Sequence, residues 1–490
     1  MVEQLTRNEQ VVGSIPTFGS IRPQYFAGFF ILEGILMLKI NGEKRLLDAV
    51  ADICLRIRDA GGRAVMVGGC VRDAIMGSAC KDIDLECYGI SAENILSCLS
   101  GQYGVDLVGA SFGVMKVKHF DIDIALPRTE NKTGYGHRGF MVDIVPGMSF
   151  ADAASRRDFT INAIMYDPLT AEIIDPWNGQ DDLQKGLLRH VSGHFMEDPL
   201  RVLRAMQFTA RFGFRVAEET VEVCRSMSQD ELPAERLSAE WEKLLLKGVK
   251  PSLGLDFLRE CGWIRYYPEL EALIGCEQTP VWHPEGDVWR HTLLCLDEAA
   301  KLRSKDDDDL VLMLAVLCHD LGKPATTFVR KDGRIVSPGH DAAGKAPALS
   351  FINRIWHRND LPERVLPLVE HHMAPAQFVK GNAGDRAYRR LALEVQRLDL
   401  LAKLARCDVI STGVDVPGRL KDLDVFLERA HSLNVEKEVP RPILLGRHLI
   451  AMGIAPGPEM GKLLSMAFEA QLDGAFNDLD GALRFIKEHA

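Results

Sequence analysis

Two aspartates near the start of the chain have a spacing that suits metal binding. Asp82 and Asp84 are two residues apart in an apolar run, so on a strand both carboxylates project from the same face. Adjacent carboxylates repel each other unless a cation lies between them, and Mg²⁺ prefers such oxygen ligands. An aspartate pair alone is more often an ordinary solvent-facing pair at a strand edge.

A glycine turn in the preceding segment favours a metal site over an ordinary surface pair. Residues 64–89 read AVMVGGCVRDAIMGSACKDIDLECYG, which predicts a strand, a turn, a short helix and the strand that carries the aspartates. Gly68 and Gly69 allow backbone N–H groups to approach a phosphate, and Arg72 opens the helix near its positive end. The segment predicts metal-assisted phosphoryl or nucleotidyl transfer.

GGCVRD followed by DID resembles the nucleotidyltransferase superfamily that includes DNA polymerase beta, and specifically the class II tRNA nucleotidyltransferase and bacterial poly(A) polymerase family. The resemblance implies an α/β nucleotidyltransferase head with a polymerase-beta-like mixed sheet, followed by an all-α neck, a body and a tail that contains an HD domain. It implies Mg²⁺ in the head, ATP and CTP as substrates, tRNA as partner, and nucleotide binding by Gly68, Gly69, Arg72 and Asp73.

The segment FDIDIALPR offers a third carboxylate. Asp121 and Asp123 alternate on a predicted strand, and polymerase-type sites use three carboxylates to hold two ions. In the family an acidic residue a few positions before an arginine fills this place. Asp123, five residues before Arg128, fits best, so the predicted catalytic set is Asp82, Asp84 and Asp123, with Asp121 facing solvent.

The motif ASRRDFTINAIMYDP at 154–168 adds groups that suit a nucleotide. Arginine is a natural triphosphate ligand, and Asp or Asn can bind ribose hydroxyls. We expect Arg157 and Asp158 at the start of a helix, with Asn162 one turn later. RRDFTINA resembles the second motif of the family, which implies that these three residues bind the nucleotide. The alternative is a helix cap with surface arginines.

The segment GHFMEDPLRVLRAMQFTARFGF at 193–214 predicts a helix with one basic and aromatic face. That face carries Arg201, Arg204, Phe208 and Arg211. Asp198 and Arg201 match the family motif EDxxR, which selects ATP and CTP by pairing with the base edge, and Arg204 is assigned to the same nucleotide site. The alternative is a surface ion pair between residues three apart.

The second half holds a separate pattern of metal-ligand types. His291, the pair His319-Asp320 and Asp408 occur in apolar segments predicted to be helical. Imidazoles and carboxylates together suit a divalent transition metal or Mg²⁺. The pattern resembles the HD phosphohydrolase superfamily, with WHPEGDVWRHT and LGK as matching flanks. His340, His371 and His372 are second-rank candidates for metal ligands. Lys323 is a candidate for contact with a phosphate.

Composition limits the class of protein and its compartment. The chain has 490 residues and a net charge of −11, so RNA binding must depend on local basic clusters. Its 11 cysteines form no CxxC pair, which predicts free thiols and a cytoplasmic protein. The apolar segment 25–40 contains Glu33 and is too short to span a membrane, so no membrane partner is expected. Residues 1–36 are expected to be a poorly ordered extension or an additional helix on the head.

These observations predict a domain order and a function. The predicted domains are 1–45 extension, 46–170 head, 171–280 neck and body for nucleotide selection and RNA binding, 281–430 HD domain, and 431–490 helical tail. The resemblance implies template-independent addition of CCA to tRNA, together with a metal-dependent phosphatase or phosphodiesterase. The alternatives are a poly(A) polymerase, an enzyme that adds only A or only CC, a non-catalytic nucleotide sensor, and an HD hydrolase with an RNA-docking head. The oligomeric state stays open.

Overall fold

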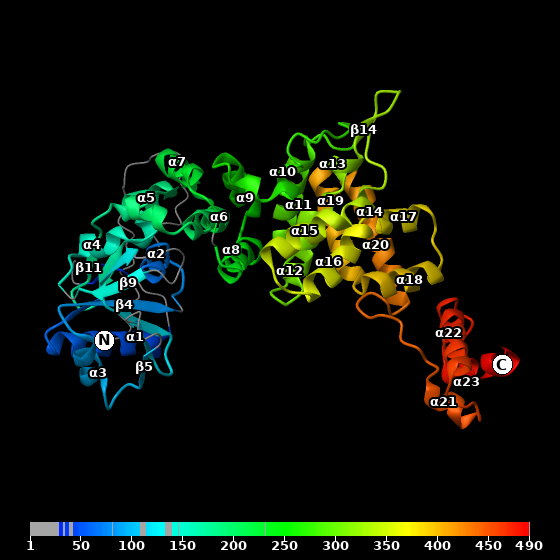
Figure 1. Ribbon diagram of the computed structural model, residues 1–490, viewed down its shortest axis with the longest axis horizontal. Helices are drawn as coiled ribbons and strands as arrows, with labels where there is room; N and C mark the ends of the chain where they lie inside the picture. Colours follow the sequence, from blue (N-terminus) through cyan, green and yellow to red (C-terminus); the bar gives the residue numbers. More distant parts are fainter. Residues whose placement is uncertain are drawn as a thin grey trace, which may run out of the picture. The chain divides into compact units, whose positions relative to one another are not determined.

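The computed structural model describes residues 29–32, 35–38, 43–80, 82–107, 114–132, 140–145, 147–230 and 232–489. The chain divides into two compact units, Met1–Asp198 and Pro199–Ala490. In Figure 1 the strands of the central sheet carry the blue and cyan colours of the first unit, and helices dominate the green to red second unit.

A seven-stranded mixed sheet forms the centre of the first unit, with the order β11-β10-β3-β4-β7-β6-β5. Strands β4 and β7 pair in parallel, and the other neighbours pair antiparallel. The predicted α/β head is therefore confirmed. The strands are β3 (Arg63–Val67), β4 (Ile83–Tyr88), β5 (Val105–Leu107), β6 (Val114–Val117), β7 (Ile122–Ala125), β10 (Met165–Asp167) and β11 (Glu172–Ile174).

Short helices and hairpins surround this sheet. The amphipathic helix α1 (Lys44–Asp59) buries Leu46, Ile53 and Ile57 and contacts β3, which explains its apolar spacing. Ser91 caps α3 (Ala92–Leu99) by accepting a hydrogen bond from the backbone of Asn94. The other elements are α2 (Gly69–Ile75), α4 (Phe150–Ser155), α5 (Gly179–Lys185), the 3₁₀ helices η2 (Thr160–Asn162) and η3 (Gly193–Glu197), β12 (Leu187–Leu188), and the hairpin of β8 (Arg128–Lys132) with β9 (Phe140–Ile144).

The expected helix at Arg157 and Asp158 is wrong. Helix α4 ends at Ser155, and the chain then becomes extended at Phe159, which forms a β-bridge with His190. The backbone N–H of Thr160 donates to Arg189, and that of Val191 donates to Asp158. Pairing with this distant segment overrides the local helical pattern, and only the short η2 remains.

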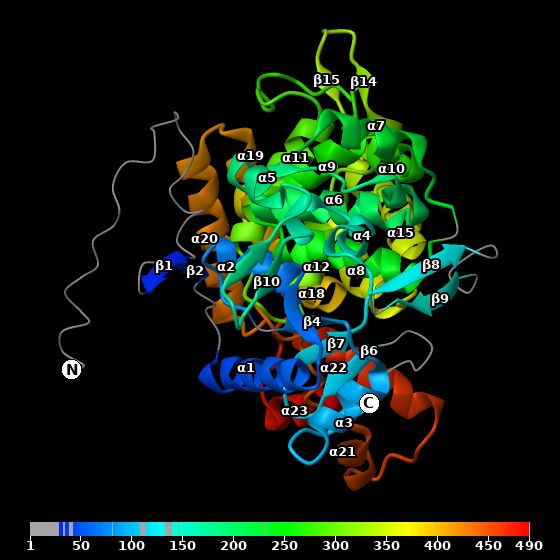
Figure 2. The same cartoon turned by 90° about the vertical axis from the view of Figure 1, so that its left-hand side faces the viewer.

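The apolar amino-terminal segment forms strands where it is described. β1 (Phe29–Leu32) and β2 (Ile35–Leu38) make an antiparallel hairpin, so the expected additional helix is wrong for these residues. Figure 2 shows the hairpin in dark blue. Residues 1–28 lie outside the described residues.

Helices build the second unit around a buried central helix. Every residue of α12 (Asp309–Cys318) is buried, in keeping with the apolar sequence LVLMLAVLC. The short hairpin of β14 (Phe328–Val329) with β15 (Ile335–Val336) departs from the expected all-α organisation. The other helices up to residue 301 are α6 (Leu200–Phe212), α7 (Glu218–Ser226), α8 (Ala234–Lys247), α9 (Pro251–Glu260), α10 (Pro268–Glu271) and α11 (Val288–Lys301). Beyond α12 they are α13 (Lys323–Thr326), α14 (His340–Ala343), α15 (Lys345–Ile355), α16 (Asp360–Glu370), α17 (Ala374–Lys380), α18 (Asp385–Val395), α19 (Leu398–Thr412) and α20 (Val416–Ser432).

An aromatic core fixes the helices beside α12. The Trp241 ring meets Tyr267, Phe351 and Trp356 edge to face, and its indole N–H donates to the Tyr267 hydroxyl at 3.0 Å. These contacts join α8 to α15, and α8 in turn contacts α12.

The end of the chain has a small apolar core of its own. It lies among α21 (Gly446–Ala451), α22 (Pro458–Leu472) and α23 (Leu479–His489), with Leu449 and Ile486 buried at its centre. None of the described helices is long and apolar enough to cross a membrane.

Candidate functional site

Two of the three predicted catalytic carboxylates are register partners in the central sheet. Asp84 on β4 faces Asp123 on the parallel neighbour β7, and Asp82 directly precedes β4. The pKa of Asp84 is raised, mainly because neighbouring atoms desolvate its carboxyl and secondly because Asp123 repels its charge. This desolvation is local, since the residue as a whole is exposed. Asp82 contributes in the same direction. The three carboxylates thus concentrate negative charge that a cation can neutralise.

The glycine turn lies beside the Asp84 carboxylate and Arg157. Gly68 has φ +75°, a conformation that favours glycine, and a Cβ there would lie 3.8 Å from an Asp84 carboxylate oxygen and 3.3 Å from Arg157 Nη1. The Arg157 guanidinium donates to Glu86 at 3.2 Å. Gly69 begins α2, and a Cβ on it would lie 3.5 Å from Arg72 Nη2. The structure therefore brings the turn, the arginine and the carboxylates together.

Four other predicted nucleotide-binding residues, Arg72, Asp73, Asp158 and Asn162, form one hydrogen-bond network. Arg72 is 4% exposed and donates to Asn162 Oδ1 at 2.6 Å and to Asp73 Oδ1 at 2.7 Å. Asn162 in turn donates to Asp158 Oδ1 at 2.9 Å. These groups satisfy one another's hydrogen-bonding capacity. Their network therefore fixes the shape of the turn that precedes the carboxylates.

The two residues predicted to read the base, Asp198 and Arg201, lie close together in the sequence at the start of α6. Asp198 follows η3 and ends the first unit, whereas Arg201 lies in the first turn of α6 in the second. The predicted face of α6 is confirmed, because the guanidinium carbons of Arg204 and Arg211 lie 5.3 and 5.7 Å from the centre of the Phe208 ring.

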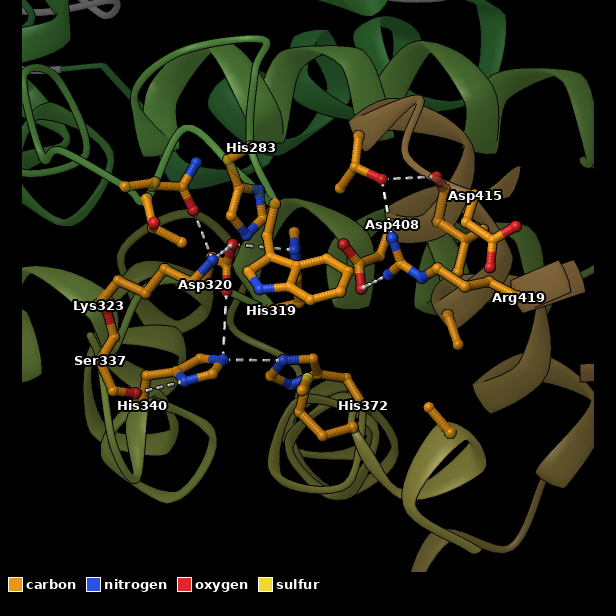
Figure 3. A pocket seen from close by; sticks show the side chains of 18 of the residues that line it. His283, His319, Asp320, Lys323, Ser337, His340, His372, Asp408, Asp415 and Arg419 are labelled. Atoms are coloured by element: carbon orange, nitrogen blue, oxygen red, sulfur yellow. Dashed lines mark hydrogen bonds and ion pairs between the residues drawn. The ribbon is translucent and has the colours of Figure 1, made fainter. Parts of the chain in front are cut away.

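A second cluster surrounds the end of the buried helix α12. His319 follows α12 directly, and its Nε2 lies 3.2 Å from Asp320 Oδ2. His291 on α11 places its Nε2 3.7 Å from the same Asp320 oxygen and 3.3 Å from Asp408 Oδ1 on α19. All four residues predicted for this metal site therefore meet. Figure 3 shows His319, Asp320 and Asp408 among the residues that line the adjoining cavity.

Hydrogen bonds fix the orientation of these imidazoles. The Nδ1–H of His319 donates to the Val316 carbonyl at 2.7 Å, and that of His291 donates to Glu285 Oε1 at 2.7 Å. Each ring therefore turns its Nε2 atom toward the cluster, the orientation that metal-ligating histidines adopt. Among the described residues His319 Nε2 is buried without a hydrogen-bond partner, and the buried Asp320 carboxylate has only ion-pair contacts, the shortest of them to Lys323 Nζ at 2.7 Å. The donor set fits a bound divalent cation.

Neighbouring imidazoles and Lys323 keep the carboxylates of this cluster ionised. Burial alone would raise the pKa of Asp320, but His319 and Lys323 hold it well below its usual range. For Glu285, hydrogen bonds from His283 and His291 outweigh burial and lower the pKa to about 2. Both carboxylates are therefore ionised at neutral pH.

The second-rank candidates separate into two groups. His340 Nε2 lies 3.5 Å from Asp320 Oδ1 and 3.1 Å from His372 Nε2, so both rings belong to the cluster (Figure 3). His371 pairs instead with Glu394 at 2.9 Å. Lys323 Nζ lies 2.7 Å from Asp320 Oδ2 and donates to Gln278 at 2.6 Å.

The cluster forms one wall of a cavity of about 440 Å³, a volume within the range of small-molecule sites. Trp282, Lys380 and Arg419 contribute to its other walls.

Sequence reasoning missed the two side chains that orient the cluster, Glu285 and Gln278. Glu285 lies six residues before His291 within WHPEGDVWRHT, and that carboxylate next to a candidate ligand was the available signal. Gln278 had no signal, because only the fold brings it to Lys323.

Comparisons with known proteins bear on both units. Residues 64–189 match the family model of the poly A polymerase head domain. Residues 213–274 match the model described as probable RNA and SrmB-binding site of polymerase A. The matches support the predicted family. The first covers the glycine turn, the three aspartates and the RRD motif.

Solved structures of similar fold cover most of the chain. A Bacillus stearothermophilus CCA-adding enzyme in complex with CTP is 22% identical, with a TM-score of 0.62 over 91% of this chain and 98% of that one. A Thermotoga maritima CCA-adding enzyme complexed with tRNA is 19% identical, with a TM-score of 0.56 over 91% and 96%. A CCA-adding enzyme in complex with ATP is 19% identical, with a TM-score of 0.59 over 91% of this chain and 94% of that one. At these identities the likeness establishes the fold: a mixed-sheet head followed by a mostly helical remainder.

Proposed function

We propose that this chain is a cytoplasmic tRNA nucleotidyltransferase that adds CCA to the 3′ end of tRNA from CTP and ATP. The observation that carries the proposal is the register pairing of Asp84 with Asp123, beside Asp82 and the Gly68 turn. The match to the poly A polymerase head domain supports the reaction type. The fold neighbours that are CCA-adding enzymes with CTP, ATP or tRNA favour this substrate set over poly(A) synthesis.

The residues of the head have distinct roles in this reaction. Asp82, Asp84 and Asp123 would hold two Mg²⁺, which supply charge neutralisation for the attacking 3′ hydroxyl and for the pyrophosphate leaving group. The tRNA oxygen forms a bond to the α-phosphorus while the bond to pyrophosphate breaks. The backbone at Gly68 and Gly69 leaves room for the triphosphate, and Arg157 donates to it. The network of Arg72, Asp73, Asp158 and Asn162 holds this turn in place.

We assign nucleotide selection to Asp198 and to residues of α6. Asp198 accepts from, and Arg201 donates to, the edge of the incoming base, with Arg204 on the same helix face. The match of residues 213–274 to an RNA-binding model supports tRNA contact by α7, α8 and α9.

The specificity is tested with three tRNAs, ending at the discriminator base, at C and at CC. Each is incubated with one NTP at a time in Mg²⁺, and the products are sequenced. The proposal requires CTP incorporation on the first two and a single A on the third. A poly(A) product would favour poly(A) polymerase. Addition to the third tRNA alone would favour an A-only enzyme, and addition to the first two alone would favour a CC-only enzyme.

We also propose that residues 281–430 form an HD phosphohydrolase domain that trims phosphate from RNA ends. The convergence of His291, His319, Asp320 and Asp408 carries this proposal. These residues would hold a divalent transition metal or Mg²⁺, which supplies Lewis acidity for attack on phosphorus. Lys323 and Arg419 face the cavity as donors to phosphate oxygens. Water oxygen bonds to phosphorus, one P–O bond to ribose breaks, and the ribose oxygen takes the proton. This step releases a 2′-phosphate directly, whereas a 2′,3′-cyclic phosphate is first opened to a 2′-phosphate and released by a second hydrolysis.

An RNA ending in a 2′,3′-cyclic phosphate or a 2′-phosphate tests this activity. Release of the phosphate in the presence of Mn²⁺, Ni²⁺, Co²⁺ or Mg²⁺ is expected. Failure with all four metals would contradict the proposal, and the nucleotidyltransferase proposal would stand unaffected.

A further inference from the structure

A glutamate two residues beyond Asp84 on β4 has no role in the proposed reaction. Side chains alternate along a strand, so Asp84, Glu86 and Tyr88 lie on one face of the sheet. The register partners of Glu86 are Val65 on β3 and Ala125 on β7, and neither side chain can donate a hydrogen bond. A carboxylate between such neighbours costs free energy unless other groups pair with it, so packing in the sheet gives no reason for a glutamate here.

Two side chains pair with Glu86 through the same carboxylate oxygen. The Tyr88 hydroxyl donates to Glu86 Oε2 at 2.7 Å, and the Arg157 guanidinium donates to it at 3.2 Å. Tyr88 is buried, and its ring packs edge to face on Phe150 with 4.6 Å between the ring centres. Burial, followed by the charge of Glu86, raises the pKa of Tyr88, so the hydroxyl stays a donor at neutral pH. Tyr88 therefore anchors the carboxylate that holds Arg157.

Arg157 is held by Glu86 but keeps donors that no acceptor uses. Among the described residues Glu86 is its only ion-pair partner, and its Nε is buried there without a hydrogen-bond partner. Its Nη1 lies beside the glycine turn, 3.3 Å from the position of a Cβ on Gly68. A guanidinium has five N–H donors, so most of them remain for another acceptor at this turn.

Asp84 is the carboxylate that would compete for Arg157. The charge of Arg157 opposes the rise in the pKa of Asp84, so the two groups are close enough to interact. Yet of the ion pairs among the described residues, none joins Arg157 to Asp84. Side chains two residues apart on a strand are separated by about 7 Å, a distance that a released arginine side chain can span. An ion pair of Arg157 with Asp84 would occupy a predicted metal ligand.

We propose that Glu86 is a positioning residue for nucleotidyl transfer. It holds Arg157 away from Asp84, so that Asp84 stays open to a metal ion and the remaining donors of Arg157 stay available for the triphosphate. The inference rests on the proposed nucleotidyltransferase and adds a residue that acts through Arg157 without touching the reacting atoms. In the absence of Glu86, Mg²⁺ would have to break an ion pair of Arg157 with Asp84 before it could bind.

Binding of CTP at different Mg²⁺ concentrations tests the proposal without any turnover. The full-length chain is titrated with CTP in a calorimeter, in the absence of tRNA and over a range of Mg²⁺ concentrations. Glu86→Ala should raise the Mg²⁺ concentration that gives half of the maximal CTP affinity by roughly tenfold, because Arg157 then competes for Asp84. At saturating Mg²⁺ the Kd for CTP should lie within about threefold of wild type. A Kd that is weakened equally at every Mg²⁺ concentration would overturn the positioning role.

A double variant decides whether Glu86 acts through Arg157. Arg157→Ala removes the group that would compete for Asp84, so the addition of Glu86→Ala to it should leave the Mg²⁺ requirement unchanged. A further increase in the double variant would show that the charge of Glu86 attracts Mg²⁺ directly, and it would overturn the proposal.

Milder variants and a matched control accompany these measurements. Tyr88→Phe removes one hydrogen bond from Glu86 and should raise the Mg²⁺ requirement by about threefold or less. Glu86→Gln keeps the size of the side chain and replaces Glu86→Ala if that variant unfolds; no increase in folded Glu86→Gln would overturn the proposal. Glu172→Ala is the control, because Glu172 pairs with Arg63 at 2.6 Å on the same sheet, and its Mg²⁺ requirement should equal that of wild type.

The wild-type titration separates this inference from the function on which it rests. A wild-type chain that binds no CTP at any Mg²⁺ concentration would overturn the proposed nucleotidyltransferase and the role of Glu86 together. Wild-type binding with an unchanged Mg²⁺ requirement in Glu86→Ala would overturn the role of Glu86 alone.

Discussion

The head and the buried cluster differ in how much of a metal site the protein itself supplies. In the head three aspartates on strand ends offer oxygen atoms only, and Asp82 and Asp84 are open to solvent. In the second unit His319 and Asp320 are at most 2% exposed, and hydrogen bonds fix the rings. The head is suited to Mg²⁺ that arrives with a nucleotide, whereas the buried cluster is suited to a cation that stays with the protein.

The largest expected effect separates the two sites by activity. Asp84→Ala and Asp82→Ala should lower nucleotide addition by several orders of magnitude, because each removes a metal ligand, and should leave phosphate release from RNA ends unchanged. Addition is measured with radiolabelled CTP, and a circular dichroism spectrum checks the fold. Near-normal addition by either variant would end the assignment of this site.

The reciprocal change should break only the second activity. His319→Ala removes a ligand from the buried cluster, so hydrolysis of a terminal phosphate should fall below detection while CCA addition stays within about twofold. If both activities disappear in a folded variant, the buried cluster is a structural part of the tRNA site.

Nucleotide selection should respond less steeply. Arg201→Ala is expected to lower the preference for ATP and CTP over UTP and GTP by about 10- to 100-fold, since a charged hydrogen bond to the base edge is lost. Competition reactions with all four NTPs measure the preference. Arg211→Ala is the control, because it lies on the same helix face near Phe208. Unchanged selectivity in Arg201→Ala would remove the base-reading role.

Chelation provides a direct contrast between the two centres. After brief treatment with EDTA and desalting, nucleotide addition should require added Mg²⁺ at once, while the buried cluster should retain its metal for longer. Metal content and both activities are followed over time. Loss of both metals at the same rate would refute the difference in how the sites hold cations.

The smallest expected effect is on stability. The raised pKa of Asp84 means that its charged form is disfavoured in the folded state. The charged carboxylate therefore lowers the free energy of unfolding above the unfolded-state pKa, and this destabilisation disappears as Asp84 is protonated at lower pH. Asp84→Asn should therefore raise the melting temperature of the metal-free protein at pH 7 by a few degrees at most. Mg²⁺ should stabilise the wild-type chain more than the variant, and a lower melting temperature for Asp84→Asn would contradict this interpretation.

The sequence predicted those parts of the fold that depend on local pattern. Apolar segments in 64–89 predicted β3 and β4, the alternation of Asp121 and Asp123 with apolar residues predicted β7, and the spacing of Arg204, Phe208 and Arg211 predicted the face of α6. The pairing of Phe159 with His190 was not predictable, because the partner strand is distant in sequence and local propensity favours a helix.

The candidate sites were predictable as sets of residue types and not as geometries. The motifs named Asp84 and Asp123, but only the parallel pairing of β4 with β7 makes them neighbours. Likewise His371 and His372 are equivalent in the sequence, and only the end of α16 turns His372 to the cluster and His371 to Glu394.

One measurement tests the central claim that a single chain carries two independent centres. A tRNA lacking CCA and ending in a 2′,3′-cyclic phosphate is incubated with CTP, ATP, Mg²⁺ and Mn²⁺, and its 3′ end is sequenced. The wild-type chain should free the end and add CCA, whereas Asp84→Ala should stop after trimming and His319→Ala should leave the end blocked. A mixture of the two variants should restore CCA addition, and a mixture that stays inactive would contradict the account.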